Sequence, residues 1–321
     1  MSNSRLHDYA IYVLKRIFYA VLTLWAVVTI TFILMKAIPG DPFTIEGNMS
    51  EAAYYNLLSY YNLDKPWPVQ YLGYLKSVAT FDFGPSMVND RLDANYYITN
   101  GLPVTMELGM QAALVAVAGG FLLGILAALH HNKVLDYLTM FIAIIGVSVP
   151  SFIMARLLTL VLSPEYFPVA GWNSRLHTVL PTIALAALPM AQVARLMRSS
   201  MLEVLSQDYI KTAKAKGLRR SIIILKHAVR NAILPVVSIL GTVIASLLTG
   251  SFVIEKIFVI PGMGDALIKS IGNRDYPIIM ASTVVYCIVL VILTLIVDLL
   301  YPIIDPRIDL VSAGGVTNSD E

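Results

Sequence analysis

Six long blocks of mostly apolar residues run through this chain, and they constrain its fold more than any other feature. About 20 apolar residues in a row span the hydrocarbon core of a bilayer as a helix, and a helix satisfies its own backbone hydrogen bonds there. Only 14% of the 321 residues are charged, whereas soluble domains average about a quarter. We therefore expect an all-α integral membrane protein with six transmembrane helices, at residues 17–36, 104–129, 137–162, 177–197, 233–254 and 280–303.

The first and fourth blocks are the least regular. The first follows Lys15 and Arg16, as a secretory signal would, but it is long and carries no small-residue cleavage pattern before Pro42. We therefore expect it to be a retained helix. The fourth block contains Pro181 and Pro189, which a spanning helix tolerates when neighbouring helices satisfy the freed backbone groups.

The Lys and Arg residues predict the orientation. With the N-terminus inside, 14 of them fall on inner segments and 7 on outer segments, and the outer segments are longer. Basic residues favour the cytoplasmic side, so both termini are expected in the cytoplasm. This divides the chain into an N-terminal segment (1–16), a transmembrane permease domain (17–303) and a tail (304–321). The domain includes an outer cap at 37–103 and a cytoplasmic hairpin at 198–232.

Two outer segments have recognisable local patterns. The cap is rich in aromatic residues, and a helix is expected to start at Ser50, with a second helix after the break at Pro66. The cap is either a self-packed lid or a docking surface for an external partner. The later outer segment, 255–264, contains a tight turn at Pro261 and Gly262, and it either gates the bundle or lies on its surface.

The cytoplasmic hairpin has the most specific pattern. Between Arg195 and Arg230 the chain holds nine basic and two acidic residues. Ser206 is expected to cap a helix that ends at Lys216, where Gly217 supplies a left-handed stop, and Ser221 is expected to cap a second helix.

One face of the first hairpin helix carries Tyr209, Ala213 and Gly217 at intervals of four residues. Small residues there would leave a notch in which another protein could dock. A basic loop that only sets membrane topology is the alternative for the lysines taken singly.

The hairpin resembles the coupling loop of binding-protein-dependent ABC importer permeases, in the peptide and nickel branch, most like the first permease subunit of oligopeptide importers. The general pattern has an acidic residue and an alanine where this chain has Lys211 and Thr212, a departure typical of the peptide branch. The stretches that carry the resemblance are Asp208–Gly217, His227–Pro235, Pro39–Pro42, Phe83–Ser86, Glu255–Gly264, Arg274–Pro277 and Asp305–Arg307.

This resemblance implies a subunit that conducts peptides across the cell membrane without ATPase activity of its own. No phosphate-binding glycine loop is present in the sequence. The implied partners are a second permease subunit in a heterodimer, two ATP-binding subunits that hold ATP and Mg, and an extracytoplasmic peptide-binding protein, with no nucleic acid. The expected ATPase-docking residues are Tyr209, Lys211, Thr212, Ala213, Lys214, Ala215 and Gly217, and the expected outer gate or binding-protein contact is formed by Phe258, Pro261, Gly262 and Gly264.

Charged residues at membrane depth are further candidates. Arg156, in the third block, either meets a peptide carboxylate or extends to the membrane surface. We expect no metal site and no catalytic residue, because the single Cys287 excludes cysteine-based zinc and the paired His130 and His131 lack further ligands. The alternatives are dipeptides or nickel chelates on the same scaffold, or an ion-coupled secondary transporter. That transporter would need more acidic residues inside the spans than Asp298.

Overall fold

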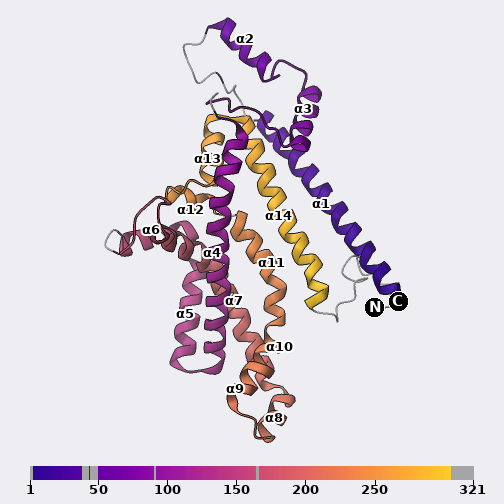
Figure 1. The fold of residues 1–321 in the computed structure, drawn as a ribbon. Helices are drawn as coiled ribbons and strands as arrows, with labels where there is room; N and C mark the ends of the chain where they lie inside the picture. The colour runs from indigo at the N-terminus through magenta and orange to yellow at the C-terminus, as the bar shows by residue number, and fades with distance from the viewer. Residues whose placement is uncertain are drawn as a thin grey trace.

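A computed structural model describes residues 3–37, 43, 50–89, 92–163, 166–249 and 251–304. Within these ranges the chain is helical, and its one extended pairing is an isolated bridge between Pro85 and Asp93. The long helices form an elongated bundle, with α2 and α3 at one end and α8 to α10 at the other (Figure 1). We call these the cap end and the hairpin end. Two of the resembling stretches, Pro39–Pro42 and Asp305–Arg307, lie outside the described residues.

The helices follow in chain order, and a π-helix, Ile223–Val229, joins α9 to α10. They are α1 (Asn3–Ala37), α2 (Glu51–Tyr60), α3 (Trp67–Thr80), α4 (Ala94–Leu129), α5 (Val134–Ser148), α6 (Ser151–Leu162), α7 (Arg175–Ser206), α8 (Asp208–Ala215), α9 (Arg220–Ile222), α10 (Arg230–Ala232), α11 (Leu234–Thr249), α12 (Phe252–Ile257), α13 (Met263–Asn273) and α14 (Tyr276–Ile304).

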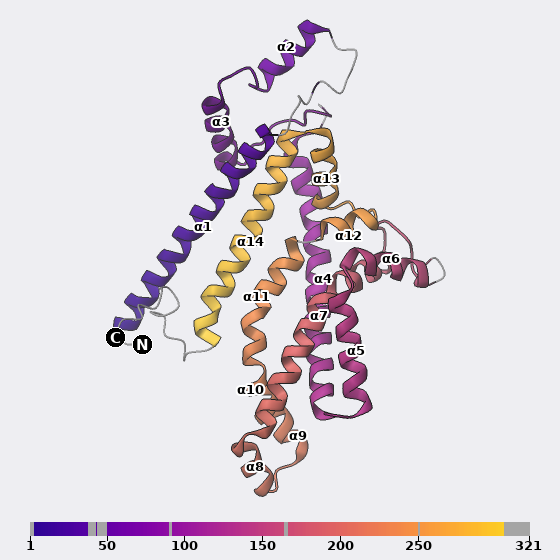
Figure 2. The ribbon, with the colours of Figure 1, turned by 180° about the vertical axis from the view of Figure 1, so that it is seen from behind.

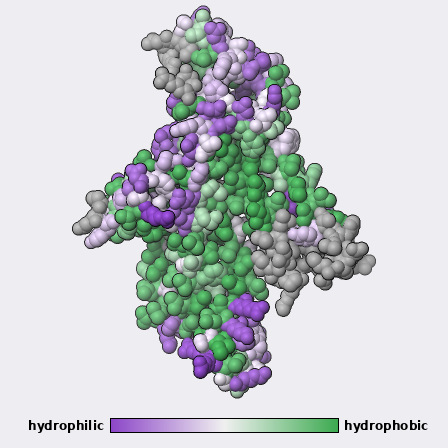
Figure 3. All heavy atoms as spheres, viewed as in Figure 1, coloured by the Kyte–Doolittle hydropathy of each residue, from purple (hydrophilic) through white to green (hydrophobic). Residues whose placement is uncertain are grey.

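Among the described residues five stretches are long and apolar enough to span a membrane. They are Ile11–Ala37, Ala94–Leu129, Arg175–Ser206, Leu234–Ile257 and Tyr276–Val297. A sixth span results if the bent pair α5 and α6 counts as one. Hydrophobic residues cover most of the middle of the bundle, and hydrophilic residues gather at its two ends and on the flank where α6 and α12 lie (Figure 3). This all-α arrangement with five or six spans confirms the expected fold class.

The predicted single helix at 137–162 is wrong. The chain breaks between Ser148 and Ser151, and α5 and α6 meet at a bend of 114°. Proline disfavours helical geometry in the residue before it, and Val149, which precedes Pro150, is extended with φ −95° and ψ 118°. As a result α6 lies across the bundle instead of along it (Figures 1 and 2).

Three other boundaries also differ from expectation. The helix α4 starts at Ala94, ten residues before the predicted span, because Asp93 accepts a hydrogen bond from the backbone N–H of Asn95 and caps it. Residues 94–103 therefore belong to the bundle and not to the cap. The helix α7 runs on to Ser206, beyond the predicted residue 197, and it continues through both of its prolines, as expected from the sequence. The fifth predicted span lies within the candidate span Leu234–Ile257, except for residue 233. That span contains two helices, α11 to Thr249 and α12 from Phe252.

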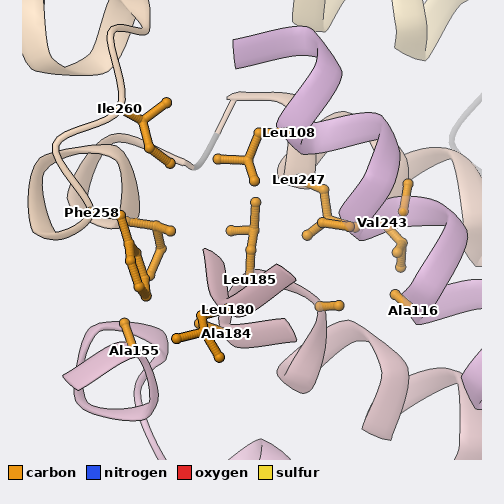
Figure 4. Packing of buried hydrophobic residues seen from close by; sticks show 14 residues of the cluster. Leu108, Ala116, Ala155, Leu180, Ala184, Leu185, Val243, Leu247, Phe258 and Ile260 are labelled. Carbon is orange, nitrogen blue, oxygen red and sulfur yellow. The ribbon is translucent and has the colours of Figure 1, made fainter. Parts of the chain in front are cut away.

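The core of the bundle is the contact between α4 and α7, where glycines allow close approach. A Cβ atom on Gly120 would lie 2.6 Å from Val193 Cβ, and one on Gly124 would lie 2.6 Å from the Ala194 carbonyl oxygen. Small residues at such contacts are typical of helix pairs in membranes. Buried residues including Leu108, Leu180 and Phe258 extend this core toward α6 and α12 (Figure 4).

We predict opposite effects for the same substitution at two helical glycines. Gly124→Ala places a methyl group against backbone atoms of α7 and should lower the thermal unfolding temperature. Gly73→Ala, in α3, has nothing within 4 Å of the added Cβ and should raise stability by up to about 1 kcal/mol through helix propensity. Thermal unfolding of the purified protein in detergent measures both. Equal effects would contradict the close packing of α4 on α7.

Candidate functional site

Neither of the two predicted serine caps of the hairpin is present, whereas the predicted glycine stop is. The N-cap of the hairpin helix α8 is Gln207 without a side-chain cap, because the Ser206 hydroxyl donates instead to the Glu203 carbonyl oxygen at 2.7 Å. Ser221 lies inside α9 and caps nothing. The predicted stop is confirmed, since α8 ends at Ala215 and Gly217 adopts a φ of 73°.

The predicted docking notch is filled by the chain itself at Ala213. Ile210 and Ala213 are 0% and 7% exposed and pack against α7 and the π-helix, in a cluster with Met201, Ile223 and Ala228. The face of α8 that stays open carries Lys211, Thr212 and Ala215, with Lys214 and Gly217 also exposed at its end. Ala213 thus anchors the helix to the bundle, whereas Tyr209 and Gly217, the other two positions of the predicted notch, are exposed.

Tyr209 lies on the flank of α8, with 42% of its surface exposed. Its hydroxyl oxygen accepts a hydrogen bond from Asn231 Nδ2 at 3.0 Å. Asn231 belongs to α10, and it also donates to the His227 carbonyl oxygen. Tyr209 therefore ties α8 to the second arm of the hairpin, so the two arms form one body.

A buried ion pair, which the sequence patterns gave no reason to expect, fixes the hairpin end of the bundle. Asp136 in α5 is 2% exposed, and Arg198 in α7 donates to both of its carboxylate oxygens, from Nε at 2.6 Å and from a terminal nitrogen at 2.7 Å. The backbone N–H of Asn132 and the ring of His131 also contact this carboxylate. The turn after α4 is therefore clamped to α7.

The turn between α12 and α13, residues 258–262, is called the Glu255 turn because it encloses the buried carboxylate of Glu255 in α12. Glu255 is 0% exposed and accepts hydrogen bonds from the Ser251 hydroxyl and from the Gly264 N–H, the latter at 2.8 Å. A Cβ on Gly262 would lie 2.7 Å from Thr105 Oγ1 of α4. These glycines are needed so that the turn can approach Glu255 closely.

The expected gate residues therefore have mostly internal roles. Phe258 is 1% exposed, Gly262 and Gly264 are buried, and only Pro261 of the four is on the surface. In addition, the Phe258 carbonyl oxygen accepts a hydrogen bond from the Gly171 N–H at 2.8 Å. This segment braces α4, α12 and α13 against each other.

Helices α12 and α13 are joined by charges on the surface of the turn. Asp265 pairs with Lys256 at 3.2 Å and with Lys269 at 2.5 Å. Partial burial acts to raise the pKa of Asp265, but the two lysines outweigh it and hold the pKa below its usual range. The aspartate is therefore charged and paired at neutral pH.

Two of the resembling stretches, nearly 190 residues apart, meet at the cap end. Asp275 is 2% exposed, and it accepts hydrogen bonds from the Ser86 hydroxyl and from the Met87 N–H, at 3.1 Å for the latter. Since Ser86 belongs to the cap and Asp275 to the turn between α13 and α14, this contact fastens the cap to the bundle.

Arg156 lies on the exposed surface of α6 and forms no ion pair or hydrogen bond with any described residue. A second arginine, Arg195, lies where two long helices form a depression. Arg195 of α7 lines this shallow, open depression of about 550 Å³ between α7 and α11, together with Gln192, Leu196, Ser199, Ile239, Thr242 and Val243. The sequence prediction had assigned Arg195 to the basic cytoplasmic run. No group of three metal-ligating side chains exists in the part of the chain that the structure describes.

Two family models match the chain. The one described as binding-protein-dependent transport system inner membrane component matches residues 120–310. The corresponding N-terminal model for the membrane components of such systems matches residues 10–89. Together they include the hairpin, the Glu255 turn and most of the cap.

Several curated proteins are similar over nearly the whole chain. The dipeptide transport system permease protein DppB of Bacillus subtilis is 52% identical over 305 residues, which cover 94% of this chain and 99% of that protein. DppB of Lactococcus lactis is 42% identical, with 93% and 99% covered. The oligopeptide transport system permease protein OppB of Escherichia coli is 38% identical, with 92% and 98% covered.

Two solved structures share the fold. A methionine ABC transporter in an inward-facing conformation aligns with a TM-score of 0.52. The alignment covers 67% of this chain and 97% of the chain in that structure. An amino acid ABC transporter aligns with a TM-score of 0.50, and covers 66% and 94%. Each is 17% identical to this chain, so the likeness concerns the fold alone.

We predict that the Asp136–Arg198 pair is essential for stability. Asp136→Asn leaves the guanidinium group of Arg198 without its charged partner and should cost about 1–3 kcal/mol, since hydrogen bonds to charged groups are involved. The control is Asp208→Asn, which breaks the pair with Lys211 at 2.8 Å; both side chains there are largely exposed, and such pairs contribute about 0–1 kcal/mol. Thermal unfolding distinguishes the two, and equal losses would contradict the clamp.

Proposed function

The chain belongs to the family of binding-protein-dependent transport system inner membrane components and is a permease subunit of a peptide-importing ABC transporter, and we propose that ATP-hydrolysing partners drive it through α8. It is a multi-pass protein of the cell membrane. The matches to peptide permeases confirm the resemblance that the motifs predicted. Among the relatives, the 52% identical one is named for dipeptides and the 38% identical one for oligopeptides. Oligopeptides are the proposed cargo and dipeptides the alternative.

The proposed orientation puts the hairpin end in the cytoplasm and the cap end outside. The exposed residues of the hairpin include five basic side chains between Lys211 and Arg220, namely Lys211, Lys214, Lys216, Arg219 and Arg220. Basic segments stay on the cytoplasmic side. In this orientation the hairpin faces the compartment that contains ATP, and the cap faces an extracytoplasmic peptide-binding protein.

The proposed contact with an ATPase subunit is the open face of α8. Lys211, Thr212 and Ala215 are exposed on it, while Ile210 and Ala213 hold the helix to the bundle. A force on this face therefore reaches α7 through buried contacts. ATP and Mg bind to the partner subunits, whose closure would push on α8 and open the passage outward, and hydrolysis would reset it. A second permease subunit would complete the passage.

The proposed contact with the peptide-binding protein involves the cap and Pro261. The buried Phe258, Gly262 and Gly264 would support this surface from below. Because the Glu255 turn braces α4 against α13, a partner that presses on Pro261 would act on the same two helices.

The proposed peptide path runs past Arg195. Gln192, Arg195 and Ser199 share one exposed face of α7, and Thr242 of α11 lies opposite them across the depression. A charged residue among spanning helices is energetically costly, so its presence there points to a function. The guanidinium group of Arg195 is suited to the carboxylate at the C-terminus of a peptide.

The docking assignment is tested by a bulky substitution on the open face. Ala215→Trp should leave membrane insertion intact but reduce peptide import at least about tenfold, the effect of losing about 1.4 kcal/mol of contact, and should uncouple ATP hydrolysis from peptide. Leu225→Trp, at a position 68% exposed elsewhere on the hairpin, is the control. Import into vesicles with the complete transporter is the measurement. Normal import by Ala215→Trp would refute the assignment, and import driven by an ion gradient without ATPases would favour a secondary transporter.

The roles of Arg195 and Arg156 are distinguished by measuring the import of two peptides. The peptides differ only in whether the C-terminus is a free carboxylate or an amide. Arg195→Gln should slow import of a peptide with a free carboxylate by about tenfold, since a charged hydrogen bond contributes about 1.5–3 kcal/mol, and should affect the C-amidated peptide little. Arg156→Gln should affect neither. If Arg156→Gln instead slowed only the free-acid peptide, the path would run past α6.

A further inference from the structure

A cavity of about 660 Å³ lies at the cap end between α1, α3 and α14. Its volume is in the range of small-molecule sites. Its floor consists of residues at the ends of two spans, namely Phe32 and Met35 of α1 and Tyr276 and Met280 of α14. Since these helices enter the bilayer at this level, the cavity lies at the boundary between hydrocarbon and water.

The walls of this cavity are fixed by specific contacts. The ring of Phe32 lies 5.9 Å from that of Tyr74 and 5.3 Å from that of Tyr71, both in α3. The Tyr71 and Thr29 hydroxyls are hydrogen-bonded at 2.7 Å. Gln70 donates to the Lys65 carbonyl oxygen at 2.6 Å and so holds the turn before α3. The cavity is therefore built between two helices that are already locked together.

The charge of the lining is of one sign. Lys36, Lys65 and Lys76 line the cavity, and none of the described residues that line it is acidic. The ammonium group of Lys36 lies over the rings of Phe32 and Tyr276, at 5.9 and 5.7 Å from their centroids. The ammonium group of Lys36 above an apolar floor, with the exposed Lys65 and Lys76 in the same lining, matches a ligand with an anionic head and a hydrocarbon body.

A polar group in the wall lacks a partner. Tyr74 lines the cavity, and its buried hydroxyl has no hydrogen bond to any residue that the structure describes. Leaving such a group unsatisfied costs about 1–3 kcal/mol. Burial also raises the pKa of this phenol above its ordinary value, so it remains a donor that an oxygen atom of a ligand could accept from.

We propose that this cavity is a binding site for an anionic phospholipid, with the phosphate held by Lys36, Lys65 and Lys76 and the acyl chain lying on Phe32, Met35 and Met280. The surroundings fit a lipid, because Leu72, which lines the cavity, and Trp67 at the start of α3 are 65% and 63% exposed. Tryptophan and lysine beside exposed apolar residues are typical of segments at a membrane surface. A peptide carries a positively charged amino terminus beside its carboxylate, and none of the described lining residues offers an acidic side chain to that amino terminus.

The test is native mass spectrometry of the assembled, delipidated transporter titrated with dioleoyl phosphatidylglycerol or dioleoyl phosphatidylcholine. We expect the anionic lipid to bind more tightly, and the double variant Lys65→Gln, Lys76→Gln to lose most of that preference, about fivefold per lysine. Arg175→Gln is the control for charge, because Arg175 is exposed at the start of α7 and does not line the cavity. Tyr74→Phe should reduce binding while keeping the fold.

Several outcomes would overturn the proposal. Equal binding of the two lipids, or equal loss of preference in the Arg175→Gln control, would show that the cavity does not select an anionic lipid. Competition by glycerol phosphate at the same concentration as the lipid would identify a site for a soluble phosphate. Competition by an imported peptide would assign the cavity to the transport path. Retained unfolding temperatures in the variants exclude misfolding as the cause of a loss.

Discussion

The close contact between α4 and α7 is the constraint on which the rest of the structure depends. Gly120 and Gly124 let the two backbones approach to distances that no side chain would allow. The pair of Asp136 and Arg198 then fixes α5 to the same unit. Only the extended Gln207 separates α7 from α8, Ile210 and Ala213 pack α8 against the bundle, and α4 reaches the Glu255 turn through Thr105, so a continuous set of contacts connects the two ends of the molecule. A permease that transmits force from an ATPase to an external gate needs such a connection.

The Glu255 turn and the cap end follow the same logic, with buried polar contacts in addition to the close packing of Gly262 and Gly264. Glu255 and Asp275 are both buried carboxylates, and each is satisfied by a serine hydroxyl and a backbone N–H. Buried acids of this kind are stable only when they are fully hydrogen-bonded. They connect segments that are far apart in the sequence, so the stretches that resemble other permeases act mainly as structural joints, and the surfaces offered to partners lie beside them.

The sequence was sufficient for features that arise from local chemistry. The apolar blocks, the stop at Gly217 and the tight turn at Gly262 all follow from residue type and spacing. It was insufficient where distant residues compete for the same space. Ala213 looked like an open notch because periodicity shows that residues share a face, but not whether that face is covered. Ser206 failed as a cap because its hydroxyl bonds backward to Glu203. The bend at Pro150 was hidden by the uniform hydrophobicity around it.

We propose that α8 moves together with α4 and α7 as a single lever. Spin labels on Lys216, the exposed C-cap of α8 outside the proposed docking face, and on the exposed Tyr96 of α4, in a chain with Cys287→Ser, measure this directly by pulsed electron resonance in the complete transporter. We predict that their distance changes by less than about 2 Å between nucleotide-free and ATP-bound states, the scale of small helix shifts, while the distance from Lys216 to the second permease subunit changes by more. A large change within this chain would contradict the account, because α8 would then be a hinge and not the end of a lever.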